Sequence, residues 1–206
     1  NAGKYPKSRG KNSSRNQTVV FTTNIHKNMT HSGILDFAIE TAKHAGSILM
    51  QHFGKISRVD RKSTDIDLLT IADTESEAYI LNRIKTTYPQ HHIIAEESNL
   101  TKGNSDYRWV IDPLDGTTNF VHNLPIFAVS MGLQYKEETI LGVVYNPAAN
   151  KCFWAEKNGG AYLNDKPIHI TSTNTLSNSL LVTGFPYIHD DRFEKCFDLF
   201  KELYGK

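Results

Sequence analysis

The chain has little cysteine, no long apolar run and almost no net charge. Two cysteines among 206 residues are too few for a disulfide framework or a cysteine-based zinc site. No apolar run approaches the roughly 20 residues that a bilayer-spanning helix needs, so no integral membrane protein is expected. A formal charge of +1 argues against a globally basic nucleic-acid binder. With 39% hydrophobic and 22% charged residues, the chain has a globular composition.

The charge is unevenly distributed along the chain. Residues 1–28 carry six Lys and Arg and no acid, whereas residues 29–206 carry 17 basic and 22 acidic residues. The first segment is rich in Asn, Ser and Thr, so we expect a flexible basic tail or leader there. It has no apolar segment typical of a secretory signal. We therefore expect a cytoplasmic protein, or an organellar one if the leader is a transit remnant, with the folded domain in 29–206.

Apolar spacing and turn residues predict an α+β fold, in which helices come first and an antiparallel sheet follows. Apolar residues recur at helical spacing in three segments, and β-branched and aromatic residues gather in several short runs. The expected helices span residues 32–53, 74–88 and 191–205. The expected strands span 92–95, 107–113, three antiparallel runs within 127–157, and 179–185.

Acidic residues gather where the first two expected strands end. Glu96 and Glu97 follow the first strand, and Asp112 and Asp115 stand three residues apart at the end of the second. No His or Cys accompanies Glu96, Asp112 and Asp115 within these motifs. Oxygen donors alone suit hard cations such as Mg²⁺ or Mn²⁺ rather than zinc.

The segment that begins at Asp112 reads Asp-Pro-Leu-Asp-Gly-Thr, which is typical of a tight turn. Its proline fixes φ, and Gly116 lets the backbone approach a ligand closely. The amides of Gly116 and Thr117 are then able to donate to an anion, as in a phosphate-binding nest. Two metal ions held by these acids beside such a turn would form a site for the hydrolysis of a phosphate ester. The spacing alone is equally consistent with a pair of ordinary surface turns, because Asp-Pro and Asp-Gly pairs are common turn formers.

The segment WVIDPLDGTTNFVHNLP (109–125) closely resembles the signature of the inositol monophosphatase family, the magnesium-dependent, lithium-sensitive phosphatases. Five further segments resemble successive family segments in the same order: KSTDIDLLTIAD (62–73), IIAEES (93–98), FAVSMGL (127–133), GVVYNP (142–147) and GGAYLNDKPI (159–168). The resemblance covers roughly residues 32–185. It implies a layered α/β sandwich with a mainly antiparallel sheet in this half, a homodimer and a small phosphorylated substrate.

The resemblance also implies a set of ligands for two or three Mg²⁺ ions. Glu96 and Asp112 would bind the first ion, with the backbone carbonyl of Leu114 as a further ligand. Asp112 and Asp115 would share the second ion. Glu96 would reach a third through water, and it belongs to the expected catalytic group for that reason.

The remaining family roles concern the attacking water and the phosphate. Thr117 and Asp73 would orient and deprotonate the water, while the amides of Gly116 and Thr117, next to Asp115, would receive the phosphate. Glu97 and Thr70 would support this pair.

Some of these positions also have a plain alternative. Lys62 would neutralise charge at the mouth of the site, but a solvated lysine is the alternative for it. Thr70 and Asp73 are equally interpreted as caps of the helix that follows. We expect His91 and His92 to form a solvated strand start rather than to bind metal.

The chain departs from the family pattern at its C-terminal end. The family usually supplies another metal ligand from a Trp-Asp-x-Ala-Ala segment, and neither Trp109 nor Trp154 is followed by Asp. We therefore expect a domain truncated at its C-terminus, with a site present in outline but incomplete.

The leading functional expectation is hydrolysis of inositol monophosphate with Mg²⁺. The alternatives are histidinol phosphate, a sugar bisphosphate or adenosine 3′,5′-bisphosphate as substrate, or a truncated non-catalytic relative. Neither a membrane nor a nucleic acid is expected as a partner.

Overall fold

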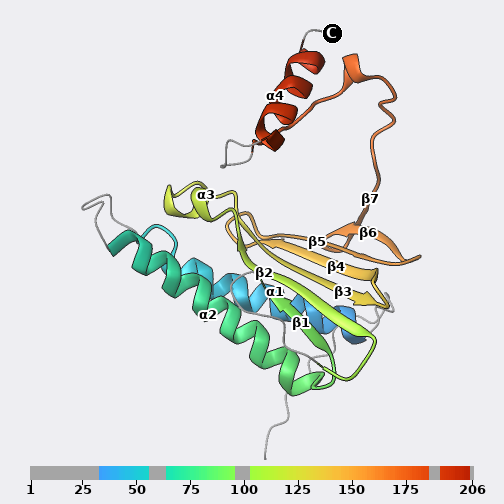
Figure 1. Cartoon of the computed structure of the whole chain (residues 1–206). Coiled ribbons are helices and arrows are strands. Elements are labelled where there is room, and N and C mark those ends of the chain that lie inside the picture. The colour runs from blue at the N-terminus through green and yellow to red at the C-terminus, as the bar shows by residue number, and fades with distance from the viewer. Residues whose placement is uncertain (1–32, 56–63, 96–102, 186–190, 205–206) are drawn as a thin grey trace, which may run out of the picture.

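Two long helices and a seven-stranded sheet form the body of the computed structural model (Figure 1). It describes residues 33–55, 64–95, 103–185 and 191–204, with the backbone alone at 64–70 and 191. The expected tail, residues 1–28, lies outside these ranges. The helices are α1 (Gly33–His52), α2 (Thr64–Thr87), α3 (Thr117–Val121), a 3-10 turn (Leu176–Asn178) and α4 (Asp191–Tyr204). The strands are β1 (His92–Ala95), β2 (Tyr107–Asp115), β3 (Ala128–Tyr135), β4 (Glu138–Asn146), β5 (Lys151–Glu156), β6 (Gly160–Leu163) and β7 (Lys166–Ile168).

The order of the strands across the sheet is the same as their order along the chain. β1 and β2 are parallel, and every later pair is antiparallel. Lys136 and Glu137 close the β3–β4 hairpin at φ 50° and 72°, which fits the type I′ turn preferred in two-residue hairpins. The expected α+β class and the expected meander are therefore confirmed. Among the described helices, none combines the length and apolarity that crossing a bilayer requires.

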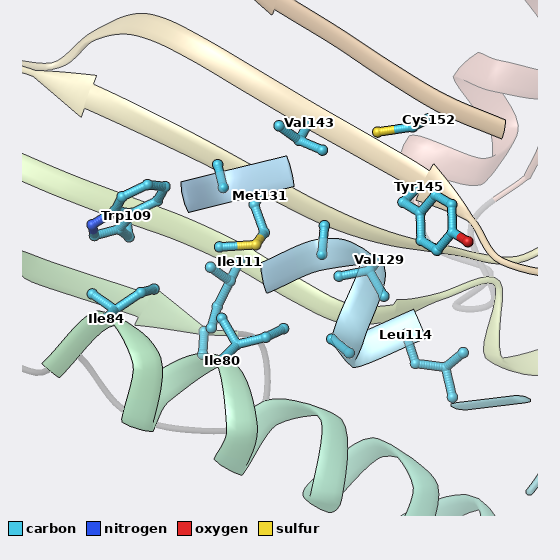
Figure 2. Close-up of a cluster of buried hydrophobic side chains, with 14 of the residues drawn as sticks. Ile80, Ile84, Trp109, Ile111, Leu114, Val129, Met131, Val143, Tyr145 and Cys152 are labelled. Atoms are coloured by element: carbon cyan, nitrogen blue, oxygen red, sulfur yellow. The ribbon is translucent and has the colours of Figure 1, made fainter. Parts of the chain in front are cut away.

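Helices α1 and α2 cover one face of the sheet and bury its core (Figure 1). The buried apolar residues of α1 recur every three or four positions, as its periodicity predicts. Figure 2 shows Ile80 and Ile84 of α2 facing the β2 side chains Trp109 and Ile111. All four side chains are at most 3% exposed. The expected first helix is thus confirmed and packs as an amphipathic helix should.

The opposite face of the sheet is largely open in the described part of the chain. Val110, Val144 and Phe153 are 39%, 41% and 39% exposed, although their neighbours along each strand are buried. Gly132 and Gly142 are register partners at the middle of this face. The side chains of this antiparallel sheet therefore alternate between a packed and an open surface.

Two expected elements differ from the structure. Helix α2 begins at Thr64 instead of 74, so Thr70 and Asp73 lie inside the helix, which excludes the alternative that they cap it. The strand expected over 179–185 is also wrong, since these residues pair with no described strand. Their β-type composition lacks a neighbouring edge, and Phe185 packs instead against α4, at 5.8 Å between its ring centroid and that of Phe200. The closing helix itself is confirmed.

His91, directly before β1, and His92, its first residue, are half-buried and not simply solvated. The His91 ring stacks between Tyr88 and Tyr107, at centroid distances of 4.9 and 4.8 Å, and accepts the Trp109 Nε1–H at 3.1 Å. Burial lowers the pKa of His91 and so favours the neutral imidazole. Its partners are aromatic, which leaves the expectation that it binds no metal standing.

Candidate functional site

The end of β2 carries the acids of the expected site. Asp112 pairs with Ser130 and Asp115 with Ala128, and the register shifts between these two pairs. An irregularity at this point accommodates Pro113, which has no N–H to give to the ladder. The strand thus runs on to Asp115, two residues past its expected end. It presents both acids at one edge of the sheet.

The Asp112 carboxylate also shapes the turn. Its Oδ1 accepts the Leu114 N–H at 3.0 Å, a local side-chain-to-backbone bond typical of Asp in turns. The Leu114 side chain is 2% exposed and belongs to the core. Burial of Leu114 and the bond to its amide fix the short segment between the two acids.

Gly116 makes the close approach that the sequence predicts, but to the protein's own backbone. Its φ is 89° and ψ 37°, a left-handed conformation that favours glycine. A Cβ on Gly116 would lie 2.9 Å from the Ile126 carbonyl oxygen and 3.2 Å from Phe127 Cα. Asn119 Nδ2 donates to the same carbonyl at 2.7 Å. The turn is therefore locked onto the segment that enters β3.

Thr117 begins α3 directly after this turn. Its hydroxyl donates to the Leu114 carbonyl at 3.5 Å, and its amide is one of the first N–H groups of a helix, which have no intrahelical acceptor. Residues 115–119 line an open pocket of about 420 Å³. Beneath it, Phe53, the residue after α1, packs with Phe120 and Phe127, with ring centroids 4.9–5.6 Å apart. An aromatic cluster thus supports the turn from the core side.

Helix α2 approaches the turn from the other side. Ser76 Oγ donates to the Pro113 carbonyl at 3.1 Å, and Ser76 is fully buried. Asp73 lies three residues earlier on the same helix face and is half-buried. His52 Nε2 lies 2.8 Å from Glu75 Oε2, which joins the end of α1 to α2. Sequence reasoning missed Ser76, His52 and Glu75. The available signal was a serine at an apolar stripe position of the helix.

The structure brings together only part of the expected site. One turn contains Asp112, the Leu114 carbonyl, Asp115, Gly116 and Thr117. Asp73 lies on α2, which is hydrogen-bonded to that turn through Ser76. Lys62, Glu96 and Glu97 lie outside the described residues, and of Thr70 only the backbone in α2 is described.

Within the described ranges, no three His, Cys, Asp or Glu side chains are grouped closely enough to hold a metal ion. Of the acids expected to bind metal, Asp112 and Asp115 are described, whereas Glu96 lies outside the described residues. These carboxylates and the Leu114 carbonyl are all oxygen donors, and such a set fits a hard cation.

Comparison with known proteins places this chain in a family. Residues 31–204 match the sequence profile of the Inositol monophosphatase family. The chain is 44% identical over 154 residues to the "Inositol-1-monophosphatase" of Synechocystis sp., covering 74% of this chain and 54% of the relative. It is 40% identical over 157 residues to the "Nus factor SuhB" of Escherichia coli, covering 75% and 58%.

Solved structures show the same similarity in three dimensions. The inositol monophosphatase of Anabaena matches with a TM-score of 0.65 at 41% identity, over 75% of this chain and 56% of that one. The Bartonella henselae suppressor protein suhB matches with a TM-score of 0.73 at 28% identity, over 85% and 68%. The chain spans little more than half the length of the curated relatives it matches. The extent of the profile match and these identities lead to one conclusion: the chain belongs to the inositol monophosphatase family.

Proposed function

We propose that the protein formed by this chain hydrolyses a phosphate monoester with Mg²⁺, and that inositol monophosphate is its substrate. The observation that supports this most directly is the turn at the end of β2. There, two carboxylates and a carbonyl lie next to the amides of Gly116 and Thr117. Names of relatives, such as that of the Synechocystis protein, support the choice of substrate.

The described oxygen donors fit Mg²⁺, and the proposal assigns Asp112, Asp115 and the Leu114 carbonyl to it, together with Glu96. When bound, Mg²⁺ would acidify a water molecule and neutralise charge that develops on the phosphate. Two or three ions are part of the proposal. Lys62, Glu97 and Thr70 stay as predicted supporting residues.

The chain's own residues would then bind and orient the reactants. The Gly116 and Thr117 amides donate to phosphate oxygens within the pocket lined by residues 115–119. The Thr117 hydroxyl and the Asp73 carboxylate hold the attacking water, and Asp73 accepts its proton. Because α3 and the β2 turn are fixed through Gly116 to the segment that enters β3, these groups need little rearrangement on binding.

Two further candidates remain beside this one. Histidinol phosphate, a sugar bisphosphate or adenosine 3′,5′-bisphosphate would replace inositol monophosphate within the same chemistry. A truncated, non-catalytic relative is the other candidate. Some relatives carry the name "Nus factor SuhB", among them the E. coli protein at 40% identity, and that name does not refer to catalysis. A homodimer and a cytoplasmic location are part of the leading proposal.

The proposal is tested by Mg²⁺-dependent phosphate release from inositol 1-phosphate, with the alternative substrates assayed in parallel. Thermal unfolding is followed over millimolar Mg²⁺, since an ion that binds the folded chain raises the melting temperature. Asp112→Asn should abolish both signals. Asp106→Asn, an exposed acid just before β2 with its only described ion pair 3.7 Å away at Lys136, is the matched control. A constant melting temperature together with no hydrolysis of any phosphate would favour the non-catalytic role.

A further inference from the structure

Helix α2 is fixed to its surroundings at two consecutive residues, directly after Asp73. Glu75 is 2.8 Å from His52 at the end of α1, and Ser76 is 3.1 Å from the Pro113 carbonyl at the end of β2. The first contact is partly solvated, because the Glu75 side chain is 54% exposed. The second is fully buried. The bond of Ser76 therefore determines more firmly where this turn of α2 lies.

Ser76 occupies a position where an apolar side chain is expected. Ala72 and Ile80, four residues before and after it, are also 0% exposed and belong to the buried stripe. A buried hydroxyl needs a hydrogen-bond partner, and a helical serine often finds one in the preceding turn of its own helix. Ser76 instead donates to a carbonyl of β2 that is 37 residues away along the chain. An alanine would fill the stripe equally well but would lose this bond.

The acceptor lies inside the proposed metal-binding turn. Pro113 stands between Asp112 and Leu114, and its carbonyl shares a peptide plane with the Leu114 N–H, which donates to the Asp112 carboxylate at 3.0 Å. Asp73 precedes Ser76 by three residues and shares its helix face. One buried hydrogen bond therefore connects the carboxylate proposed to take the proton with the turn proposed to hold the metal and the phosphate.

We infer that Ser76 is a positioning residue for this site. It holds Asp73 at a fixed distance from the Asp112–Asp115 turn without touching the substrate. The inference rests on the proposed function, and it adds a residue that the family signature does not contain. Groups that orient metal ligands from outside typically change metal affinity or activity about 10–100-fold when they are removed.

The test compares Ser76→Ala, Ser76→Thr and Ser47→Ala in the 206-residue chain. Ser47 is the matched control, because its hydroxyl also donates to a carbonyl, that of His44 at 2.6 Å, but on the exposed side of α1. Calorimetric titration with Mg²⁺ and with Mn²⁺ gives the metal affinity, and inositol 1-phosphate hydrolysis gives kcat and KM. Circular dichroism shows that each variant is folded at the assay temperature.

Ser76→Ala should weaken metal binding by about tenfold and lower kcat by about tenfold or more, with KM within about twofold. Ser76→Thr, which keeps the hydroxyl, should recover most of both, and Ser47→Ala should change neither. An unchanged metal affinity and kcat in Ser76→Ala overturns the inference. So does an equal loss in the alanine and threonine variants, since it would assign the effect to packing. If the unsubstituted chain neither binds metal nor releases phosphate, the proposed function itself fails, and this inference with it.

Discussion

Replacing Gly116 by alanine should destabilise the fold through two separable effects. Alanine at φ 89° costs about 1–2 kcal/mol, because its Cβ crowds the neighbouring carbonyl in the left-handed region. The same Cβ would also lie 2.9 Å from the Ile126 carbonyl oxygen, a backbone atom that cannot turn away. Relieving such overpacking typically costs a further ~1–3 kcal/mol. We therefore expect a total loss of about 2–5 kcal/mol in the free energy of unfolding.

Two other glycines separate these effects. Gly160 has φ 88°, but a Cβ there meets only Tyr162 ring atoms at 3.6 Å or more, so Gly160→Ala should show the conformational cost alone. Gly142 has ordinary backbone angles and open space, so Gly142→Ala should be neutral or stabilise by up to about 1 kcal/mol. Urea unfolding at pH 7, followed by tryptophan fluorescence, measures all three. Equal losses in Gly116→Ala and Gly160→Ala would refute the close contact with Ile126 and Phe127, the segment that enters β3.

Three further predictions concern the core and its edges. Because burial lowers the pKa of His91, the contribution of this residue to the free energy of unfolding is complete above pH 6.5 and is lost as the pH falls through the lower pKa of the folded state. His91→Gln should therefore lose less stability than the unsubstituted chain between pH 8 and pH 5, as measured by urea titration. Val143→Ala should lower the free energy of unfolding by about 2 kcal/mol and Val144→Ala by under ~1 kcal/mol, because these side chains are 0% and 41% exposed. Equal losses would contradict the open face of the sheet. Asn164→Ala should lower the free energy of unfolding by about 1–3 kcal/mol in chemical denaturation, since Asn164 Oδ1 accepts the Cys152 N–H at 2.9 Å. Asn164 has φ 53°, which glycine tolerates, so Asn164→Gly should give a similar loss if the hydrogen bond dominates.

The sequence predicts the elements whose signal is local. The stripe of α1 and the alternation in β3, β4 and β5 each report a buried face directly, and their boundaries agree with the structure to within a residue or two. The predicted start of α2 is wrong because Thr64, Asp65 and Asp67 are weak helix formers that favour turns and caps. Their helical state depends on packing further along α2, which no local rule contains.

The candidate site divides in the same way. The Asp112–Thr117 motif is contiguous, so its turn is predictable, and the left-handed Gly116 is what such a turn requires. The bond from Ser76 to Pro113 joins residues far apart in sequence, and a lone serine gives no indication of its partner. The failed strand at 179–185 is similar, since composition reports β propensity but not whether an edge is available.

The agreement between chain order and strand order bears on how the protein emerges from the ribosome. Each strand from β2 onward can pair with the one synthesised just before it, so the sheet is able to grow by short loop closures. Helix α1 does not share this advantage, because most of its sheet contacts are with β3, β4 and β5. Its apolar stripe is fully covered only after roughly a hundred further residues of synthesis, and until β3 is made it packs mainly against α2. The nascent α1–α2 pair therefore exposes apolar surface that a chaperone is able to bind.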